Sequence, residues 1–375
     1  RKSMGGLGRN TPPMAQIAAY YPPRSGGLER VAKICADGLS SRGYDVHVIT
    51  STQSGLQRGT TSQGKLKVSV LSSVEFAHVP VSLGFVLKMC TIPRDTLLHL
   101  HLSSAFFPEV MMCIARLRGM KYVVHFHLDV GPSGMFGKLF LVYKRFVWRP
   151  LLTNAAAVIA CAQDQVALLA KNYQVPPERI SVIPNAVSQD FFGEHERSAH
   201  PQEKLRLLSI GRLAQQKRLD RMINAFAKLT IPAELTIVGD GEKEEELRLT
   251  VSRLGLTNVV FAGKKNDEEM RGCHRTHDIF LVTSEREGMP LAVLEAMAGG
   301  LPIIATQVDG LTELIEGTGV LVKEPYVENL AFEIEALWGN PKRLAELSAK
   351  SKEKAKQYNW EKFISAVSLV YQRIS

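Results

Sequence analysis

Residues 16–50 read QIAAYYPPRSGGLERVAKICADGLSSRGYDVHVIT and contain a strand, a helix and a second strand in succession. The apolar run Gln16–Tyr21 predicts the first strand, and the β-branched stretch Asp45–Thr50 predicts the second. Between them, apolar residues three and four positions apart predict a helix over Leu28–Ser41, and Gly43 stands where helices commonly end. Strands joined in this way pair in parallel with a right-handed crossover, which indicates a parallel α/β sheet.

The alternation of strands and helices continues along the chain. In the first half, further strands are predicted at Val68–Leu71, Leu97–Leu100, Tyr122–Phe126 and Ala157–Ala160. A polar stretch without periodicity, Gly193–Lys204, then predicts a linker. Beyond it, strands are predicted at Leu205–Ile210, Ala233–Val238, Val259–Ala262, Ile279–Val282 and Pro302–Thr306, and helices at Leu219–Leu229, Glu244–Arg253, Leu291–Ala298, Leu311–Ile315, Lys342–Gln357 and Trp360–Ile374.

A chain of 375 residues is too long for one ordinary core, because domains usually hold roughly 100–200 residues. We expect a flexible arm or a vector-derived remnant at 1–13, a Rossmann-like domain at 14–190, a linker at 191–204, a second Rossmann-like domain at 205–356 and a terminal helix at 357–375. Ligands of such open sheets bind at the carboxyl ends of the strands, so the site is expected there.

Composition is that of a globular protein. Apolar residues make up 45% and charged residues 22%, which argues against disorder and against a fibrous protein. No apolar run reaches the roughly 18 residues of a membrane-spanning helix, and no signal-peptide core is found at the N-terminus. The five cysteines are scattered without a CxxC pair, so neither a disulfide framework nor a zinc site is indicated, and a cytoplasmic location is expected.

The charge is unevenly distributed. Residues 1–180 hold 21 Lys and Arg against 9 Asp and Glu, a net charge of +12, whereas residues 181–375 hold 25 against 28, a net charge of −3. A basic first half could attract an anionic substrate or an anionic membrane surface, and a solvated surface is the equal alternative.

The strongest local signal is SEREGMPLAVLEAMA, Ser284–Ala298, which follows a predicted strand and opens a helix. Gly288 allows a ligand to approach the backbone, and Pro290 suits the first helical turn. A helix N-terminus with exposed amide groups attracts an anion, so an anion site is predicted at the backbone of Gly288, Met289, Pro290 and Leu291.

Two carboxylates flank this turn. Glu287 precedes the helix and Glu295 lies eight residues later. Because a carboxylate can accept two hydroxyl hydrogen bonds, the pair suits a nucleotide sugar, with the diphosphate at the turn and a diol on either side. The equal alternative is that Glu287 caps the helix and Glu295 is a solvated helix residue.

Two cations follow another predicted strand. The strand Leu205–Ile210 ends at Gly211, which is followed by Arg212 and Lys217. Together the two cations could neutralise a leaving diphosphate, and two unrelated surface cations are the alternative.

Glycines mark two further turns. Gly239, in the motif VGDG after a predicted strand, could admit a base or a ribose. The loop with Gly26 and Gly27 resembles a phosphate-approach loop but lacks GxGxxG. An ordinary turn is the alternative in both places.

Histidines occur in pairs within two predicted strands. In VVHFHLD, strand alternation places His125 and His127 on one face, with His127 and Asp129 near the carboxyl end, where His127 could hydrogen-bond a hydroxyl near the reacting carbon. His99 and His101 form a similar pair. Structural histidines and a four-histidine metal cage are the alternatives, and the cage is disfavoured because no third-ligand pattern with carboxylate spacing joins the pairs.

Taken in order, these motifs resemble a retaining glycosyltransferase of family four (glycosyl transferases group 1) with the GT-B architecture. The matching stretches are GGLERV at Gly26–Val31, VVHFHLD at Val123–Asp129, ISVIPNAV at Ile180–Val187, LLSIGRL at Leu207–Leu213 with Lys217, IVGDG at Ile237–Gly241 and SEREGMPLAVLEAMAGGLPIIAT at Ser284–Thr306. The resemblance extends from about Ala15 to Ser375 and is strongest in the second half.

The resemblance implies an α/β fold of two Rossmann-like doubly wound parallel-sheet domains facing across a cleft, with the acceptor bound by the first and the nucleotide sugar by the second. It implies that Glu295 holds the ribose, that Glu287 contacts the transferred sugar, and that Arg212 and Lys217 hold the leaving diphosphate. His127 would lie beside the sugar and the acceptor, and the last helix would pack on the first domain.

The implied catalytic set is therefore Arg212, Lys217, His127 and Glu287, and the implied substrate-binding set is Gly26, Gly27, Asp129, Gly211, Gly239, Gly288, Met289, Pro290, Leu291 and Glu295. No metal is expected, because members of the family need none for catalysis and the chain has no DxD-type pair. Three positions depart from the family pattern: His125, where many relatives carry Thr, Arg218, where Gly follows the lysine, and Ala186, where Gly is common.

The implied activity is metal-independent, retaining transfer of a sugar from a nucleotide-diphosphate sugar, UDP-linked by first expectation, to a hydroxyl acceptor in glycan, polysaccharide or glycolipid biosynthesis. A GDP-mannose-dependent mannosyltransferase, a nucleotide-sugar epimerase on the same scaffold and a non-catalytic sugar-binding protein are the alternatives. The missing GxGxxG argues against a nicotinamide-dependent oxidoreductase, and basic residues without interleaved aromatics argue against nucleic-acid binding.

A lipid-linked acceptor at the inner face of an anionic membrane is a further expectation for the basic first half. It rests on a group of basic and aromatic residues, Lys138, Lys144, Arg145 and Arg149 near Phe136, Phe140 and Trp148. A basic helix face that covers core aromatics is the alternative.

Overall fold

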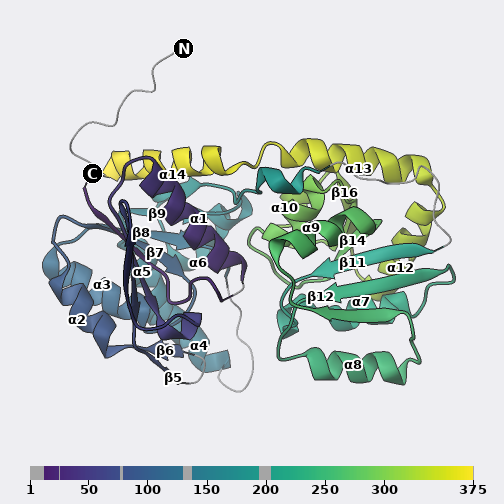
Figure 1. Cartoon of the computed structure of the whole chain (residues 1–375), viewed down its shortest axis with the longest axis horizontal. Coiled ribbons are helices and arrows are strands. Elements are labelled where there is room, and N and C mark those ends of the chain that lie inside the picture. Colours follow the sequence, from purple (N-terminus) through teal and green to yellow (C-terminus); the bar gives the residue numbers. More distant parts are fainter. Residues whose placement is uncertain (1–11, 25, 77–78, 130–136, 194–203, 375) are drawn as a thin grey trace, which may run out of the picture. The chain divides into compact units, whose positions relative to one another are not determined.

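Two mainly parallel sheets organise the chain (Figure 1). The computed structural model describes residues 12–24, 26–76, 79–129, 137–193 and 204–374, with the backbone alone at 137–139. One unit comprises the chain as far as Pro184 together with the segment from Trp360 onward, and the other comprises Asn185–Asn359. The expected pair of doubly wound α/β folds is confirmed.

The first unit contains an eight-stranded sheet in the order β10-β9-β8-β7-β1-β2-β4-β3, in which β3 alone runs antiparallel to its neighbour. The strand order reverses between β1 and β7, the kind of position where open α/β sheets bind ligands. The strands are β1 Met14–Ile17, β2 Val46–Ser51, β3 Gly59–Gln63, β4 Leu66–Leu71, β7 Leu97–Leu102, β8 Tyr122–Phe126, β9 Ala157–Ala160 and β10 Ile180–Val182, and a separate hairpin pairs β5 Val74–Phe76 with β6 Val79–Val81.

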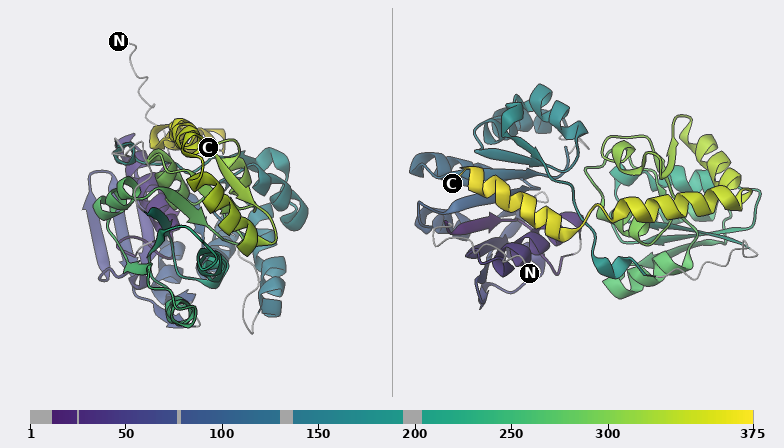
Figure 2. Two further views of the ribbon diagram at one scale, coloured as in Figure 1. Left: turned by 90° about the vertical axis from the view of Figure 1, so that its right-hand side faces the viewer. Right: turned by 90° about the horizontal axis from the view of Figure 1, so that it is seen from above.

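Helices cover both faces of this sheet. On one face, Leu98, Leu100 and Phe126 join a buried apolar cluster with Phe107 of α3. On the other face, α1 and α14 lie side by side (Figures 1 and 2). Arg42 directly follows α1, and its Nη2 donates to the carbonyl of Glu361 at 2.9 Å. The helices are α1 Gly27–Ser41, α2 Leu83–Thr91, α3 Phe107–Arg118, α4 Gly137–Tyr143, α5 Arg149–Thr153, α6 Asp164–Tyr173 and α14 Trp360–Ile374, with a π-helix, Lys144–Trp148, between α4 and α5.

The second unit has a six-stranded, wholly parallel sheet in the order β13-β12-β11-β14-β15-β16, which reverses between β11 and β14. Its strands are β11 Leu205–Ile210, β12 Ala233–Val238, β13 Val259–Gly263, β14 Ile279–Val282, β15 Ile303–Thr306 and β16 Gly319–Val322. Its helices are α7 Leu219–Phe226, α8 Glu244–Arg253, α9 Asp267–Thr276, α10 Leu291–Ala298, α11 Thr312–Ile315, α12 Tyr326–Trp338 and α13 Pro341–Ala355. None of the helices in the described part of the chain has the length and apolar composition needed to cross a bilayer.

Two boundaries differ from the sequence expectation. The first strand runs over Met14–Ile17 instead of 16–21, because the chain leaves the sheet toward Pro22 and Pro23, which have no amide hydrogen to donate. The units divide after Pro184, ahead of the predicted linker at 191–204, because Asn185 donates to the Met289 carbonyl at 2.8 Å and Val187 bridges to Asn359. Most of that predicted linker, 194–203, and residues 1–11 of the predicted arm lie outside the described residues.

Candidate active site

The candidate site lies where the strand order of the second unit reverses. β11 and β14 are hydrogen-bonded neighbours, with Leu207 in register with Ile279. The loop after β11 carries Lys217, and the loop after β14 carries Glu287. Because the two strands are parallel, both loops emerge at the same edge of the sheet, which is where ligands of open α/β sheets bind.

An ion pair joins the two loops. Lys217 Nζ lies 2.6 Å from Glu287 Oε1, and the Ser284 hydroxyl donates to the same oxygen at 2.6 Å. The Glu287 side chain is only 6% exposed and that of Lys217 is 25% exposed. Two donors on one oxygen fix the direction of the carboxylate and leave its second oxygen for other hydrogen bonds.

These residues line one pocket. Gly211, Lys217, Ser284, Glu287 and Pro290 contribute to its wall. Apolar side chains, including Ile210, Ile237, Phe280 and Val293, form the remainder. Four residues predicted from the sequence, Gly211, Lys217, Glu287 and Pro290, are thus brought together by the fold.

Other predicted residues of this unit lie outside that lining. Arg212 follows Gly211, but its exposed side chain pairs with Glu242 at 3.2 Å. Both members of that pair are more than half exposed, so the pair contributes little to stability and Arg212 can exchange its partner for a ligand. Glu295 lies in α10 and is 3% exposed, so it is not the solvated helix residue of the alternative reading.

No side chain of the described residues caps the amino end of α10. Pro290 is the N-cap residue and has no side-chain group that could accept from the first amides of the helix. Glu287 therefore does not cap α10, and its carboxylate bonds to Lys217 and Ser284 instead. Leu291 begins the helix, and the carbonyl of Met289 accepts the Asn185 amide.

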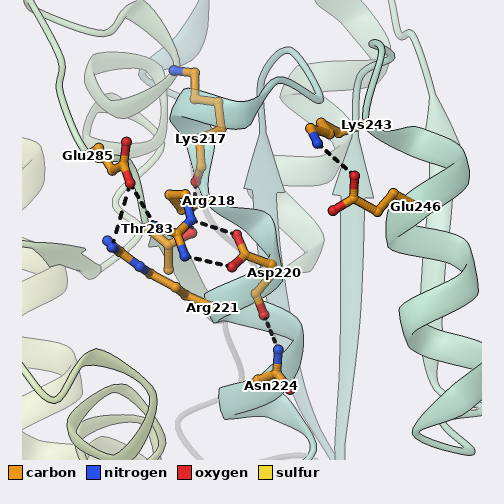
Figure 3. A network of polar contacts seen from close by, with 9 residues as sticks. All are labelled: Lys217, Arg218, Asp220, Arg221, Asn224, Lys243, Glu246, Thr283 and Glu285. Carbon is orange, nitrogen blue, oxygen red and sulfur yellow. Dashed lines mark hydrogen bonds and ion pairs between the residues drawn. The ribbon is translucent and has the colours of Figure 1, made fainter. Parts of the chain in front are cut away.

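A second set of polar contacts locks the same two loops together (Figure 3). The Arg218 guanidinium donates twice to Asp220, at 2.9 and 2.8 Å, and once to Glu285 at 2.6 Å. The Thr283 hydroxyl donates to the Lys217 carbonyl at 3.0 Å. Arg218 has a left-handed backbone, with φ of 47°, which explains why glycine suits this position in the family pattern. These contacts hold the residues next to Lys217 and Glu287.

Sequence reasoning missed Ser284, Asn185 and Gly310 as supports of this site. Ser284 stands three residues before Glu287, a serine–glutamate spacing that often produces side-chain hydrogen bonds. Gly310 has a φ of 78°, and a Cβ there would overlap the carbonyl oxygens of Glu287 and Gly288. No sequence motif around Gly310 indicates this role, because the contact joins two segments that are distant in the sequence.

Gly239 lies close to the same edge. Its φ is 132°, and a Cβ there would overlap the carbonyl oxygen of Gly211. Backbone packing therefore excludes any side chain at residue 239. This alone explains why the residue is glycine, whether or not a base or a ribose binds there.

In the first unit, Gly26 and Gly27 form the start of α1. Gly26 is the N-cap residue and Gly27 the first helical residue, with open space where its Cβ would stand. A Cβ on Gly26 would overlap the Glu29 carboxylate, which therefore lies over the amino end of the helix. The position suits an anion only when this flexible acidic side chain moves aside.

His127 and Asp129 follow β8. Burial lowers the pKa of His127 to about 3, so its ring is neutral near pH 7. Its Nε2 faces His101 Nδ1 at 2.9 Å. Asp129 Oδ1 accepts from Lys144 at 2.5 Å and from the Tyr173 hydroxyl at 2.6 Å. Asp129 is thus engaged in internal contacts on one of its two oxygens.

The basic and aromatic group expected to face a membrane is partly internal. Trp148 is 2% exposed and Lys144 pairs with Asp129, so neither can meet a bilayer. The alternative, a basic helix face covering core aromatics, fits these two residues. Phe136 and the side chain of Lys138 lie outside the described residues.

Two family models match the chain. Residues 25–191 match Glycosyltransferase Family 4, and residues 190–358 match Glycosyl transferases group 1. A curated relative, the O-antigen biosynthesis glycosyltransferase WbnH of Escherichia coli, is 28% identical over 202 residues, which is 54% of this chain. The aligned part spans about half, 55%, of WbnH.

Solved structures share the fold across nearly the whole chain. Sucrose-phosphate synthase from Thermosynechococcus elongatus superposes with a TM-score of 0.80 at 19% identity and covers 97% of this chain and 99% of its own. HepE from Anabaena, solved in complex with UDP and glucose, superposes with a TM-score of 0.78 at 19% identity and covers 97% of this chain and 100% of its own.

Gly310→Ala should destabilise the protein more than Gly317→Ala. The two glycines have φ of 78° and 74°, so both changes incur the left-handed backbone cost of about 1–2 kcal/mol. Gly317 has open space, whereas a Cβ on Gly310 overlaps the Glu287–Gly288 backbone, which adds about 1–3 kcal/mol. Thermal unfolding midpoints measure the difference in stability. Equal decreases of the midpoint in the two variants would show that the close approach of Gly310 to the Glu287–Gly288 backbone does not affect stability.

Arg218→Ala should lower the unfolding midpoint, because it removes the contacts to Asp220 and Glu285 and keeps the left-handed backbone. Arg218→Gly should be more stable than Arg218→Ala by about 1 kcal/mol, since glycine tolerates this conformation. A double-mutant cycle with Glu285→Gln isolates the Arg218–Glu285 contact. Additivity within about 0.5 kcal/mol would mean that the two loops are not coupled through it.

Proposed function

Because the chain belongs to the glycosyl transferases group 1 and has the GT-B fold, we propose that it transfers a sugar from a nucleotide-diphosphate sugar to a hydroxyl acceptor, with retention of configuration and without a catalytic metal. The observation that carries the proposal is the Lys217–Glu287 ion pair beside the α10 N-terminus, in a pocket at the edge where the strand order reverses. A cation, an acidic group and a helix N-terminus are the groups that a sugar diphosphate requires.

The ion pair would rearrange when the donor binds. A diphosphate near the pocket offers Lys217 a more highly charged partner than Glu287, which then accepts from sugar hydroxyls while Ser284 keeps it oriented. Arg212, freed from its weak pair with Glu242, would add the second cation. We assign Glu295 to the ribose and the backbone of Gly288–Leu291 to the diphosphate.

In the proposed reaction the bond between the anomeric carbon and the diphosphate oxygen breaks, and an oxocarbenium-like carbon forms. The acceptor hydroxyl attacks from the face that the diphosphate leaves, and its proton passes to an oxygen of that diphosphate. Negative charge grows on the leaving group, so Arg212 and Lys217 stabilise the transition state more than the bound donor. We assign Gly26 and Gly27 to phosphate contact, and His127 and Asp129 to the sugar and acceptor.

UDP is the proposed nucleotide, with GDP-mannose as the alternative donor. Support for UDP comes from HepE, whose structures contain UDP with glucose and UDP-glucose. Polysaccharide synthesis is proposed from the O-antigen role that WbnH carries in its name. An epimerase on the same scaffold would convert the donor sugar when no acceptor is present, so product analysis without acceptor distinguishes the two activities.

Lys217→Ala should weaken UDP binding about 10- to 100-fold, the cost of losing a hydrogen bond to a charged group. Turnover with the matching sugar donor should fall by about 10²–10³, as for loss of a transition-state donor. Calorimetry with UDP and with GDP, followed by initial rates, measures both effects. Lys228→Ala, which removes an exposed lysine paired with Glu328, is the matched control and should keep wild-type values.

Glu295→Gln should mainly weaken UDP binding. If UDP and GDP both fail to bind the wild-type chain, the nucleotide-sugar assignment falls. If UDP binds equally to the wild type and to Lys217→Ala, the nucleotide site lies elsewhere.

As a second function we propose peripheral contact with an anionic membrane, made by the hairpin β5–β6 and helix α2. Four apolar side chains there are strongly exposed: Val74 (74%), Phe76 (75%), Leu83 (74%) and Leu87 (61%). The Ser82 hydroxyl, which caps α2, donates to the Ser72 carbonyl at 2.7 Å, so hairpin and helix lie together. Exposed apolar side chains on the hairpin and the neighbouring helix, in a strongly basic half of the chain, suit a bilayer with anionic headgroups.

Co-sedimentation with vesicles of anionic lipid tests this contact. Binding should exceed that to zwitterionic vesicles and should fall in the double variant Phe76→Ser with Leu83→Ser. Phe332→Ser, which removes an equally exposed ring (68%) from α12 in the second unit, should bind as the wild type does. Equal binding by the double variant would place any membrane contact on another surface.

A further inference from the structure

Three imidazoles gather at the carboxyl ends of β7 and β8 in the first unit. His125 lies in β8 and His127 directly follows that strand, and their rings stack with centroids 4.2 Å apart. His101 stands beside His125 on β7 in the parallel register. One ring nitrogen from each lies within 4.8 Å of the others. The sequence argument disfavoured a four-histidine metal cage because no third-ligand pattern with carboxylate spacing joins the two pairs, whereas the fold brings three of the four histidines together.

Two nitrogens of this cluster are unsatisfied. His101 Nε2 and His125 Nδ1 are buried and have no hydrogen-bond partner among the described residues. Buried polar atoms are nearly always paired, so the unpaired His125 Nδ1 points to a ligand, whereas His101 Nε2 can take the proton that a ligand at His101 Nδ1 would displace. His101 Nδ1 and His127 Nε2 already face each other at 2.9 Å across a single shared proton.

We propose that His101, His125 and His127 bind one Zn²⁺ ion. Three imidazoles with an open fourth position are a zinc ligand set, with bonds of about 2.0–2.1 Å. The ion takes the place of the shared proton, which moves to the other nitrogen of the ring that carried it, His101 Nε2 or His127 Nδ1. The rings are stacked, with 16–29° between their planes, so binding turns them about their side-chain torsions until the lone pairs converge.

The surroundings favour such an ion. His99 stacks on His101 with ring centroids 4.6 Å apart and is itself bonded to the Tyr371 hydroxyl, which supports His101 from behind. Cys161 Sγ lies 3.9 Å from His125 Nε2 and offers a soft atom beside the site. His127 keeps part of its surface exposed whereas His101 and His125 are buried, so an ion can reach the cluster from the His127 side.

Binding of Zn²⁺ would occupy the ring that the proposed function assigns to the sugar and acceptor. Zinc is then a reversible inhibitor of transfer. This consequence rests on the proposed function, whereas the metal site itself rests on the histidine geometry alone.

Calorimetric titration of the full chain with ZnCl₂ tests the site, and titration with Co²⁺, whose visible absorption is intense in tetrahedral sites, reports its geometry. We expect one ion per chain, bound at least about 10- to 100-fold more weakly by His101→Gln and by His125→Gln. The control is His47→Gln, which changes a partly buried histidine on β2 that bonds to Ser69 at 2.8 Å.

Unchanged affinity in the two cluster variants would show adventitious binding elsewhere and overturn the proposal. If those variants do not fold, the Co²⁺ titration of the wild-type chain tests the proposal alone. A spectrum without the intense absorption of tetrahedral Co²⁺ would also overturn the metal site. Zinc binding without inhibition of an active enzyme would refute the inhibitory role alone. Absence of any transferase activity would refute the proposed function and leave the metal site standing.

Discussion

The ion pair between Lys217 and Glu287 is the constraint on which the second unit's candidate site depends. It joins the loops after two neighbouring parallel strands, at 2.6 Å and largely away from solvent. The Glu287 side chain is only 6% exposed, so its carboxylate is costly to leave without a positively charged or hydrogen-bonding partner. The Arg218–Glu285 contact runs parallel to this pair and fixes the same two loops.

This arrangement suits a charged ligand. The groups that hold the loops together before binding are those that a sugar diphosphate would engage, so binding exchanges one set of ionic contacts for another. The charged groups are then partly removed from water both before and after binding. The pocket keeps its shape because the Ser284 hydroxyl orients the Glu287 carboxylate, and because Asn185 and Gly310 contact the backbone of residues 287–289. Transition-state stabilisation needs donors that are already oriented in this way.

Much of the fold could be predicted from the sequence, because buried parallel strands are short runs of β-branched and apolar residues. Strands β8, β9, β11, β12 and β14 and helices α8, α10 and α14 have the predicted bounds. The edge strand β3, Gly59–Gln63, could not be predicted because all five residues are exposed and no apolar pattern marks them. The helices α9 and α12 were also missed, although Asn266 and Glu269 form a capping box at the start of α9.

The candidate site was predictable where its residues follow strands in order, as with Gly211, Lys217 and Glu287. It was not predictable where the partner comes from a distant segment. Arg218 departs from the family glycine, and only the fold shows that its guanidinium bridges Asp220 and Glu285. The sequence offered the four histidines as a metal cage and disfavoured it, and only the strand register shows that His101 stands beside His125, 24 positions further along the chain.

Hydrogen–deuterium exchange of the full chain with and without UDP tests most directly whether the loops after β11 and β14 form the nucleotide site. Amides of 211–217 and 284–295 should exchange more slowly when UDP is bound, with no comparable change in the exposed strand β3. Protection confined to other segments, or none under conditions where UDP is bound, would contradict the placement of the site around Lys217 and Glu287.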